Sequence, residues 1–356
     1  MPLEIKTTKT TTPKARPAES ELGFGRHFTD HAFIADYVEG KGWHDARIEP
    51  YHGLTFDPAS SVLHYGQAMF EGLKAFRADD GSVHLYRVDK HAKRMAWGAP
   101  RLCIPPFDTA DFIEAMRAYV AAEKDSVPHA AGTALYLRPT IVANEAFLGV
   151  RPSQRYMFFV IGSPVGSYYG GDALKPVRIW VEREQVRAPK GGLGAVKAAA
   201  NYVASLQAAV RAKKAGYDQV LWLDANEHRF VEEVGTMNLF AVLGDTLVTP
   251  PLSDSILAGV TRDSILHLAP KLGIKTEERR ISMEELATGS ENGTLREVFG
   301  SGTAAVISPV AELGLGDKTI TVGTGKPGEI AERLYKEISG IQRGTLPDPG
   351  GWRTPV

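Results

Sequence analysis

The segment with the clearest capacity for chemistry centres on one lysine, Lys197. Three glycines among the four residues 191–194 precede it, and an alanine run followed by Asn201-Tyr202 comes after it. Glycines let the backbone turn sharply and approach a ligand closely, and the small residues leave room for a bound group. A desolvated lysine is partly neutral and forms an imine with an aldehyde. The same spacing fits a glycine-rich surface loop with a solvated lysine, so both interpretations stay open on this segment alone.

The neighbourhood of this lysine does not match the common nucleotide-binding patterns. A phosphate-binding loop needs Gly-Lys followed by Ser or Thr, and a dinucleotide fingerprint needs a third glycine where Lys197 stands. Tyr202 offers a hydroxyl for the oxygen of a bound pyridine ring. Glu232 and Glu233 precede a strand, and a carboxylate beside a pyridine nitrogen keeps that nitrogen protonated and the ring an electron sink. Two solvated glutamates at a hairpin are the alternative.

Two turns of small residues are candidates for binding a phosphate. Residues 258–263 open an amphipathic segment, and the N–H groups at a helix start bind anions, helped by a neighbouring hydroxyl. Residues 299–304 form a second turn of this kind. An arginine would bind the same anion through two parallel hydrogen bonds. Either segment could also be an ordinary turn.

Aromatic residues interleave with cations in residues 64–76 and 135–139. An apolar pocket with an arginine at its rim suits an enzyme whose substrates are apolar in one half-reaction and acidic in the other. Ordinary core packing with a surface arginine is the alternative interpretation of both segments.

The periodicity of apolar residues predicts the elements that position these groups. Alternation or short apolar runs predict strands over 155–161, 177–181, 219–223, 239–243 and 247–249, the last two joined by a turn at Gly244-Asp245. Helical spacing predicts helices over 111–122, 202–215, 262–272 and 330–342. Because strands and helices do not alternate regularly, an α+β fold is favoured over a doubly wound sheet.

Length and composition predict a globular protein of two domains. The chain has 356 residues, of which 43% are hydrophobic and 23% charged. The polar residues 1–20 predict a disordered N-terminal arm. A stretch rich in Gly, Pro and Ser predicts an interdomain loop over 166–176. A small α/β domain is therefore expected over 21–165 and a large cofactor-binding domain over 177–356.

Charge and cysteine content exclude several classes of function. The net charge of -1 leaves no basic surface for nucleic acid. No apolar run approaches a membrane span, and the first residues lack the apolar core of a secretory signal, so a cytoplasmic protein is expected. The single cysteine, Cys103, allows no disulfide and no cysteine-based zinc site, and we expect it to be a small buried residue.

Taken together and in order, these motifs resemble the branched-chain amino acid aminotransferases, which are fold-type IV pyridoxal phosphate enzymes. The resemblance runs from about Phe24 to the C-terminus. Its strongest parts are Phe28-Thr-Asp-His31, Leu63-His-Tyr65, Phe70-Glu-Gly72, Leu135-Tyr-Leu-Arg-Pro139, Lys197 with Asn201-Tyr202, Glu233-Val-Gly-Thr-Met-Asn238 and Gly300-Ser-Gly-Thr-Ala304. It implies the two-domain architecture of the D-amino acid aminotransferase type. It also implies pyridoxal 5'-phosphate as cofactor and reversible, ping-pong transamination between L-leucine, L-isoleucine or L-valine and 2-oxoglutarate.

The resemblance also assigns roles to individual residues. Lys197 is implied as the catalytic residue, which carries the cofactor as an imine and moves the Cα proton. The residues implied to bind the cofactor are Arg94, Val260, Thr261 and Thr303 at the phosphate, Tyr202 at the ring oxygen and Glu233 at the ring nitrogen. Those implied to form the side-chain pocket are Phe24, Tyr65, Phe70, Tyr136 and Tyr168, with Arg138 meeting the distal carboxylate of glutamate.

Three further implications complete the expected site. Thr236 and the amide of Ala304 resemble the substrate-carboxylate site. Val150 resembles a residue that reaches the pocket of a neighbouring subunit, which implies a homodimer. Ala305 and Ser308 stand where animal members carry a CxxC redox pair, so thiol regulation is excluded there.

Other enzymes of the same fold remain alternatives, namely a D-amino acid aminotransferase or an aminodeoxychorismate lyase. These enzymes would keep the lysine and the glutamate but not the sequence motifs at residues 135–139 and 233–238. From a different class, a nucleotide-binding module would use the glycines 191–194 as a phosphate loop.

Overall fold

The alternating apolar residues of this chain form two sheets, each in its own compact unit. The computed structural model describes residues 3–166 and 174–356. The first unit comprises Met1–Gly170, Val196–Ala200 and Gly340–Val356, and the second comprises Gly171–Ala195 and Asn201–Ser339. Most of the interdomain loop expected over 166–176 lies outside the described residues. The two returns of the chain to the first unit were not predicted, and one of them carries Lys197.

The sheet of the first unit is almost entirely antiparallel. Its strands run in the order β1 (Lys6–Thr7), β3 (Gly42–Pro50), β2 (His31–Val38), β8 (Arg155–Val165), β7 (Ala134–Ala143), β5 (Leu73–Arg77), β6 (Val83–Tyr86) and β18 (Arg353–Pro355), and β4 (Ala68–Phe70) pairs with β7. Among the described strands of this sheet, only the short pairing of β1 with β3 is parallel. Because side chains alternate across a strand, Tyr136 and Arg138 of β7 lie on the same face of this sheet.

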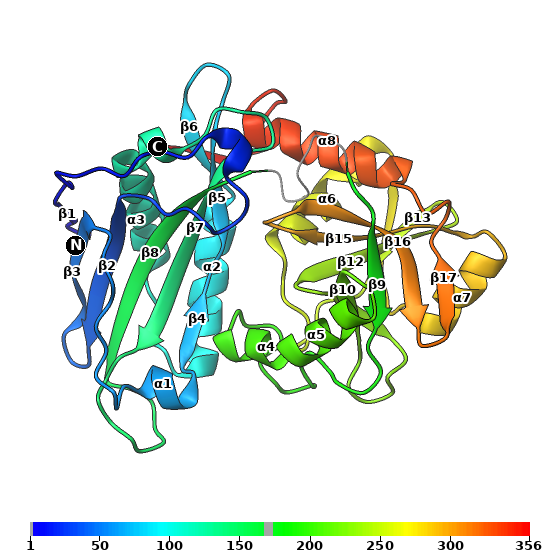
Figure 1. Ribbon diagram of the computed structural model, residues 1–356, viewed down its shortest axis with the longest axis horizontal. Coiled ribbons are helices and arrows are strands. Elements are labelled where there is room, and N and C mark those ends of the chain that lie inside the picture. Colours follow the sequence, from blue (N-terminus) through cyan, green and yellow to red (C-terminus); the bar gives the residue numbers. More distant parts are fainter. Residues whose placement is uncertain (1–2, 167–173) are drawn as a thin grey trace. The chain divides into compact units, whose positions relative to one another are not determined.

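Within its described residues, the first unit contains the whole of α1 (Ser61–Tyr65), α2 (Val88–Gly98) and α3 (Thr109–Ala122). Helix α3 packs against α2 and β2 (Figure 1). It confirms the helix predicted over 111–122, and it begins two residues earlier because Asp108 caps it by accepting hydrogen bonds from the amides of Ala110 and Asp111. Helix α2, which carries Arg94, was missed because its buried residues are spaced among charged ones.

In the second unit, six strands close into a barrel. The pairing runs from β11 (Val231–Val234) through β10 (Gln219–Leu223), β9 (Val177–Val181), β16 (Val306–Leu315), β15 (Leu295–Gly302) and β12 (Met237–Leu243) back to β11. The same sheet continues from β12 into β13 (Thr246–Thr249) and β14 (Lys275–Glu278), and β17 (Lys318–Thr321) pairs with β16. The predicted hairpin at Gly244-Asp245 is confirmed by the antiparallel pairing of β12 with β13.

The helices of the second unit begin with a segment that we predicted as one helix over 202–215. It is divided into α4 (Ala199–Ala204) and α5 (Leu206–Lys214). At the break, the Ser205 hydroxyl donates to the carbonyl of Tyr202 at 2.7 Å, a local bond that competes with the helical pattern. Helix α5 packs its buried alanines, Ala208 and Ala212, against Trp222 of β10.

Two further predicted helices are confirmed with adjusted ends. Helix α6 (Val260–Leu268) stops before Pro270, after which a short 3-10 turn covers Pro270–Leu272. The other is α8 (Glu329–Arg343), and α7 (Met283–Glu291) completes the set, packing with α6 against β15 (Figure 1). None of the helices in residues 3–166 and 174–356 is long and apolar enough to cross a membrane.

The N-terminal arm differs from the disorder that its composition predicted, because the first unit supplies partners for its backbone. After β1, the amide of Thr8 donates to the carbonyl of Ile48 at 2.8 Å. The amide of Thr10 donates to Nε2 of His31 at 2.9 Å, and that of Lys14 donates to a carboxylate oxygen of Asp30 at 2.9 Å. Hydrogen bonds of this kind fix an arm that has almost no buried apolar side chains.

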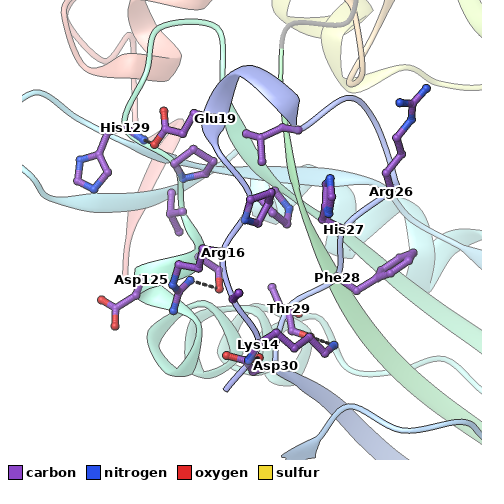
Figure 2. Close-up of a pocket in the computed structure, with 17 residues that line it drawn as sticks. Lys14, Arg16, Glu19, Arg26, His27, Phe28, Thr29, Asp30, Asp125 and His129 are labelled. Carbon is purple, nitrogen blue, oxygen red and sulfur yellow. Dashed lines mark hydrogen bonds between the residues drawn. The ribbon is translucent and has the colours of Figure 1, made fainter. Parts of the chain in front are cut away.

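The arm also walls a cavity of about 480 Å³ in the first unit. Figure 2 shows Lys14, Arg16 and Glu19 of the arm around this cavity, with Arg26 and His27 on another side. The Arg16 guanidinium donates to the Ser126 hydroxyl at 2.7 Å. None of the predicted site residues lines this cavity, so its size does not identify it as the active site.

Cys103 is exposed, which corrects the expectation that it is buried. It ends the short helical turn Ala99–Leu102 in the left-handed region, with φ of 53°. In that position its amide closes the turn and its side chain points away from the core.

Candidate active site

Lys197 is anchored to the edge of the first sheet through its own backbone. Its carbonyl accepts a hydrogen bond from the amide of Phe70 at 3.1 Å, and the next residue, Ala198, forms an isolated antiparallel bridge with Met69. Its Nζ atom lies 4.7 Å from the centre of the Phe70 ring. The amine is therefore held over an aromatic face rather than in a flexible surface loop.

The surroundings of Lys197 favour the neutral amine. The side chain is half-buried, and burial lowers its pKa from the ordinary 10.5 to about 8, with the nearby guanidinium of Arg94 acting in the same direction. A second lysine, Lys74 of β5, is buried, and burial lowers its pKa to about 8 as well. A lowered pKa alone therefore does not distinguish the two lysines. What distinguishes Lys197 is the arginine beside it and its place after the glycine loop.

An aromatic cluster with one cation lies on the same part of the first unit. The rings of Phe24 and Tyr136 meet edge to face at 5.0 Å. The guanidinium of Arg138 lies 4.6 Å from the Phe70 ring and 5.3 Å from the Tyr136 ring, and its Nη2 donates to the Tyr136 hydroxyl at 3.0 Å. The Nε of Arg138 is buried and, among the described residues, has no hydrogen-bond partner. A buried donor of this kind is costly unless an acceptor arrives.

Arg94 of α2 is held by a carboxylate that the sequence reasoning did not single out. Glu71 follows β4 directly and is completely buried. One of its oxygens accepts a hydrogen bond from Arg94 Nε at 2.7 Å, and the other accepts one from Arg94 Nη2 at 2.8 Å and lies 2.8 Å from His91 Nδ1. The one signal for Glu71 in the sequence was its place inside the motif Phe70-Glu-Gly72.

The glycine loop of the second unit is closely packed at Gly194. A Cβ placed on Gly194 would stand 2.3 Å from the carbonyl oxygen of Ser255. The buried Arg187 donates to that same oxygen at 2.7 Å and to the carbonyl of Gly194 at 3.3 Å. The Asn201 side chain donates to the carbonyl of Leu193 at 2.8 Å, which ties the far end of the loop. These contacts indicate a loop that is fixed by packing and hydrogen bonds. They disfavour the solvated surface loop that the sequence alone left open.

Glu233 is the buried acid of the pair at 232 and 233. It is 2% exposed, and one of its oxygens lies 2.8 Å from Arg187 Nε. The other accepts hydrogen bonds from the amide of Leu257 at 2.8 Å and from the Asn238 side chain at 3.3 Å. Glu232 is less buried and accepts a hydrogen bond from the Ser255 hydroxyl at 2.6 Å. Burial raises the pKa of Glu232, the chief influence on that carboxyl.

The start of α6 is shaped for a close approach. Gly259 is its N-cap, and a Cβ there would stand 1.8 Å from the Asn238 side-chain oxygen. The amides of Val260 and Thr261 lie in the first turn, where a helix offers them no acceptor of its own. These N–H groups are therefore suited to an anion.

The remaining predicted residues of the second unit lie on turns or on α4. Tyr202 is half-buried on α4, and Thr303 and Ala304 are half-buried in the turn between β15 and β16. Thr236 is exposed in the turn between β11 and β12. The turn expected over residues 299–304 is shorter than predicted, because residues 299–302 belong to β15.

Tyr65 and Val150 belong to a different surface of the first unit, which we call the α1 apolar surface. It consists of exposed large side chains of α1 and of the loop between β7 and β8, namely Leu63, Tyr65, Phe147, Leu148 and Val150. The Tyr65 hydroxyl donates to the carbonyl of Leu148. Val150 is 86% exposed. Tyr168, also predicted for the pocket, lies outside the described residues.

Comparisons with known proteins show the family of this chain. The family model for amino-transferase class IV matches residues 68–313. Branched-chain-amino-acid transaminase 1 of Bacillus subtilis (strain 168) is 53% identical over 352 residues, covering 99% of each chain. The branched-chain-amino-acid aminotransferase of Mycobacterium tuberculosis (strain CDC 1551 / Oshkosh) is 49% identical over 337 residues, covering 93% of this chain and 91% of that one.

Solved structures give the same result at lower identity. The crystal structure of the Escherichia coli branched-chain amino acid aminotransferase has a TM-score of 0.76 and 29% identity, and the match covers 91% of this chain and 98% of that one. The T.th. branched-chain amino acid aminotransferase with pyridoxamine 5'-phosphate has a TM-score of 0.75 and 28% identity, covering 90% and 97%.

The chain therefore belongs to the class IV aminotransferases and, within them, to the branched-chain-amino-acid aminotransferases. The resemblance drawn from the motifs, the α+β fold and the prediction of an aminotransferase are confirmed. Enzymes of this class use pyridoxal phosphate, and their substrates are amino acids and 2-oxo acids. The chemistry of the residues fits such a cofactor, because they offer a partly neutral lysine, an arginine, helix-start amides and a buried carboxylate.

Proposed function

We propose that this enzyme transfers the amino group of L-leucine, L-isoleucine or L-valine to 2-oxoglutarate, using pyridoxal 5'-phosphate bound to Lys197. The observation that carries this proposal is the buried, unpartnered Nε of Arg138 among the rings of Phe70 and Tyr136. An aromatic pocket suits a branched apolar side chain. A buried donor at the same place suits the distal carboxylate of glutamate, which would otherwise be buried unpaired at a cost of several kcal/mol.

The residues proposed to hold the cofactor divide by chemistry. Arg94, the amides of Val260 and Thr261, and Thr303 provide hydrogen-bond donors for the phosphate. Tyr202 provides a hydroxyl for the ring oxygen, and Glu233 a carboxylate for the ring nitrogen. When bound, the cofactor supplies an electron sink for charge that develops at the substrate Cα.

The chain itself supplies the movement of the proton. Lys197 takes the proton from the substrate Cα and returns it later in the same half-reaction, which requires an amine that is neutral near physiological pH. Burial lowers its pKa to about 8, so part of the amine is already neutral near physiological pH, whereas a lysine at the ordinary 10.5 would be almost fully charged. The ion pair with Arg187 keeps the Glu233 charge paired in a buried position. Thr236 and the Ala304 amide are the proposed donors for the substrate's α-carboxylate.

Exchanging Arg138 for methionine tests the two-substrate pocket directly. R138M should keep the apolar lining and lose the partner of the distal carboxylate. We expect kcat/KM for glutamate and for 2-oxoglutarate to fall about a hundredfold or more, and that for leucine to change less than tenfold. R155M is the matched control, because Arg155 is an exposed arginine on the neighbouring strand β8. Equal losses for all three substrates would contradict this role of Arg138.

We also propose a homodimer in which the α1 apolar surface completes the pocket of the second copy. Leu148 is 61% exposed and Val150 86% exposed, and the Tyr65 hydroxyl fixes the loop that presents them. Exposed apolar side chains that gather on one surface typically mark an interface. Tyr65 and Val150 would then serve substrate binding from the neighbouring subunit.

A panel of amino donors tests the proposed reaction. The purified protein is incubated with pyridoxal phosphate and 2-oxoglutarate, and formation of glutamate is measured with L-leucine, L-isoleucine, L-valine and D-alanine. The proposal predicts turnover with the three L-amino acids and none with D-alanine. Turnover only with D-alanine would indicate a D-amino acid aminotransferase instead. A protein that stays colourless with pyridoxal phosphate but is stabilised by a nucleotide would indicate a nucleotide-binding module.

A further inference from the structure

Glu71 is the most completely enclosed acid beside the proposed cofactor residues. It is 0% exposed, and its amide donates to the carbonyl of Pro139 at 2.7 Å, which fixes the backbone at the end of β4. Both carboxylate oxygens are engaged by the two-bond fork of Arg94, at 2.7 and 2.8 Å. A carboxylate–guanidinium fork sets the plane of the guanidinium as well as its position.

The charges of this cluster are nearly balanced. Burial by itself would raise the pKa of Glu71, but the charge of Arg94, followed by that of His91, lowers the pKa far below its usual range. Burial lowers the pKa of His91 below its usual value, and this outweighs the opposite influence of Glu71. Burial therefore favours the neutral ring of His91, and its Nδ1–H donates to the carboxylate. One negative carboxylate thus faces one positive guanidinium.

The cluster is linked to Lys197 through Phe70. Phe70, the residue before Glu71, contacts Lys197 both through its amide and through its ring. Arg94 disfavours the charged form of the Lys197 amine, and Glu71 favours it. Other titratable or charged side chains that act on this amine include Tyr136 and Arg138 of β7 and His91 of α2.

We propose that Glu71 is a positioning residue with two tasks: its carboxylate fixes the guanidinium of Arg94, and it offsets the charge of that guanidinium beside the Lys197 amine. The proposal rests on the proposed function, in which Lys197 carries the cofactor and Arg94 binds its phosphate. Without Glu71, the Arg94 side chain could turn away from the phosphate. Its positive charge would then also act on Lys197 without a counter-charge.

The variant E71Q tests both tasks, because glutamine keeps the size of the side chain but not its charge. Two quantities are measured on full-length protein: the dissociation constant of pyridoxal phosphate, and the midpoint of the pH titration of the cofactor-dependent visible absorbance. We expect the dissociation constant to rise roughly tenfold or more, as for residues that orient a ligand-binding group. We expect the midpoint to fall by about 0.5–1 pH unit, as expected when a neighbouring negative charge is removed.

Two further variants separate the tasks. E114Q removes one negative charge from the exposed face of α3 in the same unit and should change neither quantity. E71D keeps the charge but shortens the side chain, so it should weaken cofactor binding while the midpoint stays near that of the unmodified enzyme. If E71Q does not fold, E71D alone decides, and unchanged cofactor affinity in E71D would overturn the proposal.

A general loss of stability in E71Q would lower the melting temperature without moving the absorbance midpoint. An unmoved midpoint in folded E71Q therefore overturns the proposal, whatever happens to stability. Failure of the proposed function looks different: the unmodified enzyme would then show no cofactor-dependent visible absorbance. The two failures are therefore distinguishable before any variant is compared.

Discussion

The ion pair of Arg187 with Glu233 makes the sharpest prediction about the second unit. Arg187 is 8% exposed and Glu233 2% exposed, and their Nε and carboxylate oxygen are 2.8 Å apart. Arg187 also donates to the carbonyls of Ser255 and Gly194, so no water replaces it easily. The substitution R187M removes the positive partner and leaves a buried carboxylate without its counter-charge.

The cost of this change follows from burial. Breaking one side of a buried ion pair destabilises a protein by about 3–5 kcal/mol. For a unit the size of the second one, this corresponds to a fall of roughly 6–20 °C in Tm. The measurement is thermal unfolding of the cofactor-free protein at pH 7, followed by circular dichroism. R183M is the matched control, because Arg183 is an exposed arginine of the same segment and should leave Tm within about 2 °C.

A double variant tests the reason behind the loss. In R187M/E233M both charges are gone, and an apolar pair of similar volume is often as stable as the ion pair it replaces. We therefore expect the double variant to recover part of the lost Tm, because the hydrogen bonds that Arg187 and Glu233 make to other groups stay lost. The electrostatic reasoning would be refuted if R187M had the same Tm as the unmodified enzyme, or if the double variant had a lower Tm than R187M.

Two further predictions concern the amine and the assembly. With a pKa of about 8, the neutral fraction of Lys197 rises from roughly a tenth at pH 7 to about nine tenths at pH 9. The rate at which cofactor-free enzyme captures the cofactor should therefore rise with a midpoint near pH 8. A midpoint near pH 10 would show that the lysine is solvated. The variant V150D should lower the molar mass measured by light scattering toward that of one chain and raise KM for leucine at least about tenfold. The control L252D, at an exposed leucine of the other unit, should change neither quantity. A V150D protein of unchanged mass and KM would contradict the proposed dimer.

The sequence predicted best what is local and periodic. The strands at 177–181 and 219–223 have the predicted bounds, because short apolar runs mark buried strands. The helix at 202–215 was predicted as one piece, since apolar spacing does not register the Ser205 hydroxyl bonding back to Tyr202. Helix α2 was missed because charged residues are interspersed among its buried ones.

For the site, the motifs provided the residues but not their partners. The roles of Lys197, Tyr202 and Glu233 were assigned by resemblance, from the sequence motifs and their order along the chain. Their partners could not be predicted this way, because Glu71 meets Arg94 across 23 positions of sequence and no pattern marks such a pair. Arg187 lies in a segment without any motif, and only the folded chain brings it to Glu233. The burial of Lys74, and with it a second lysine of lowered pKa, was equally invisible in the sequence.

The identity of the lysine that carries the cofactor is the central claim, and peptide mapping tests it most directly. The holoenzyme is reduced with borohydride, which makes the bond between lysine and cofactor permanent, and is then digested and analysed by mass spectrometry. The account predicts the phosphopyridoxyl mass on Lys197 alone, and its loss together with the visible absorbance in K197A. A label on Lys74, the other buried lysine, or on no lysine at all would contradict it.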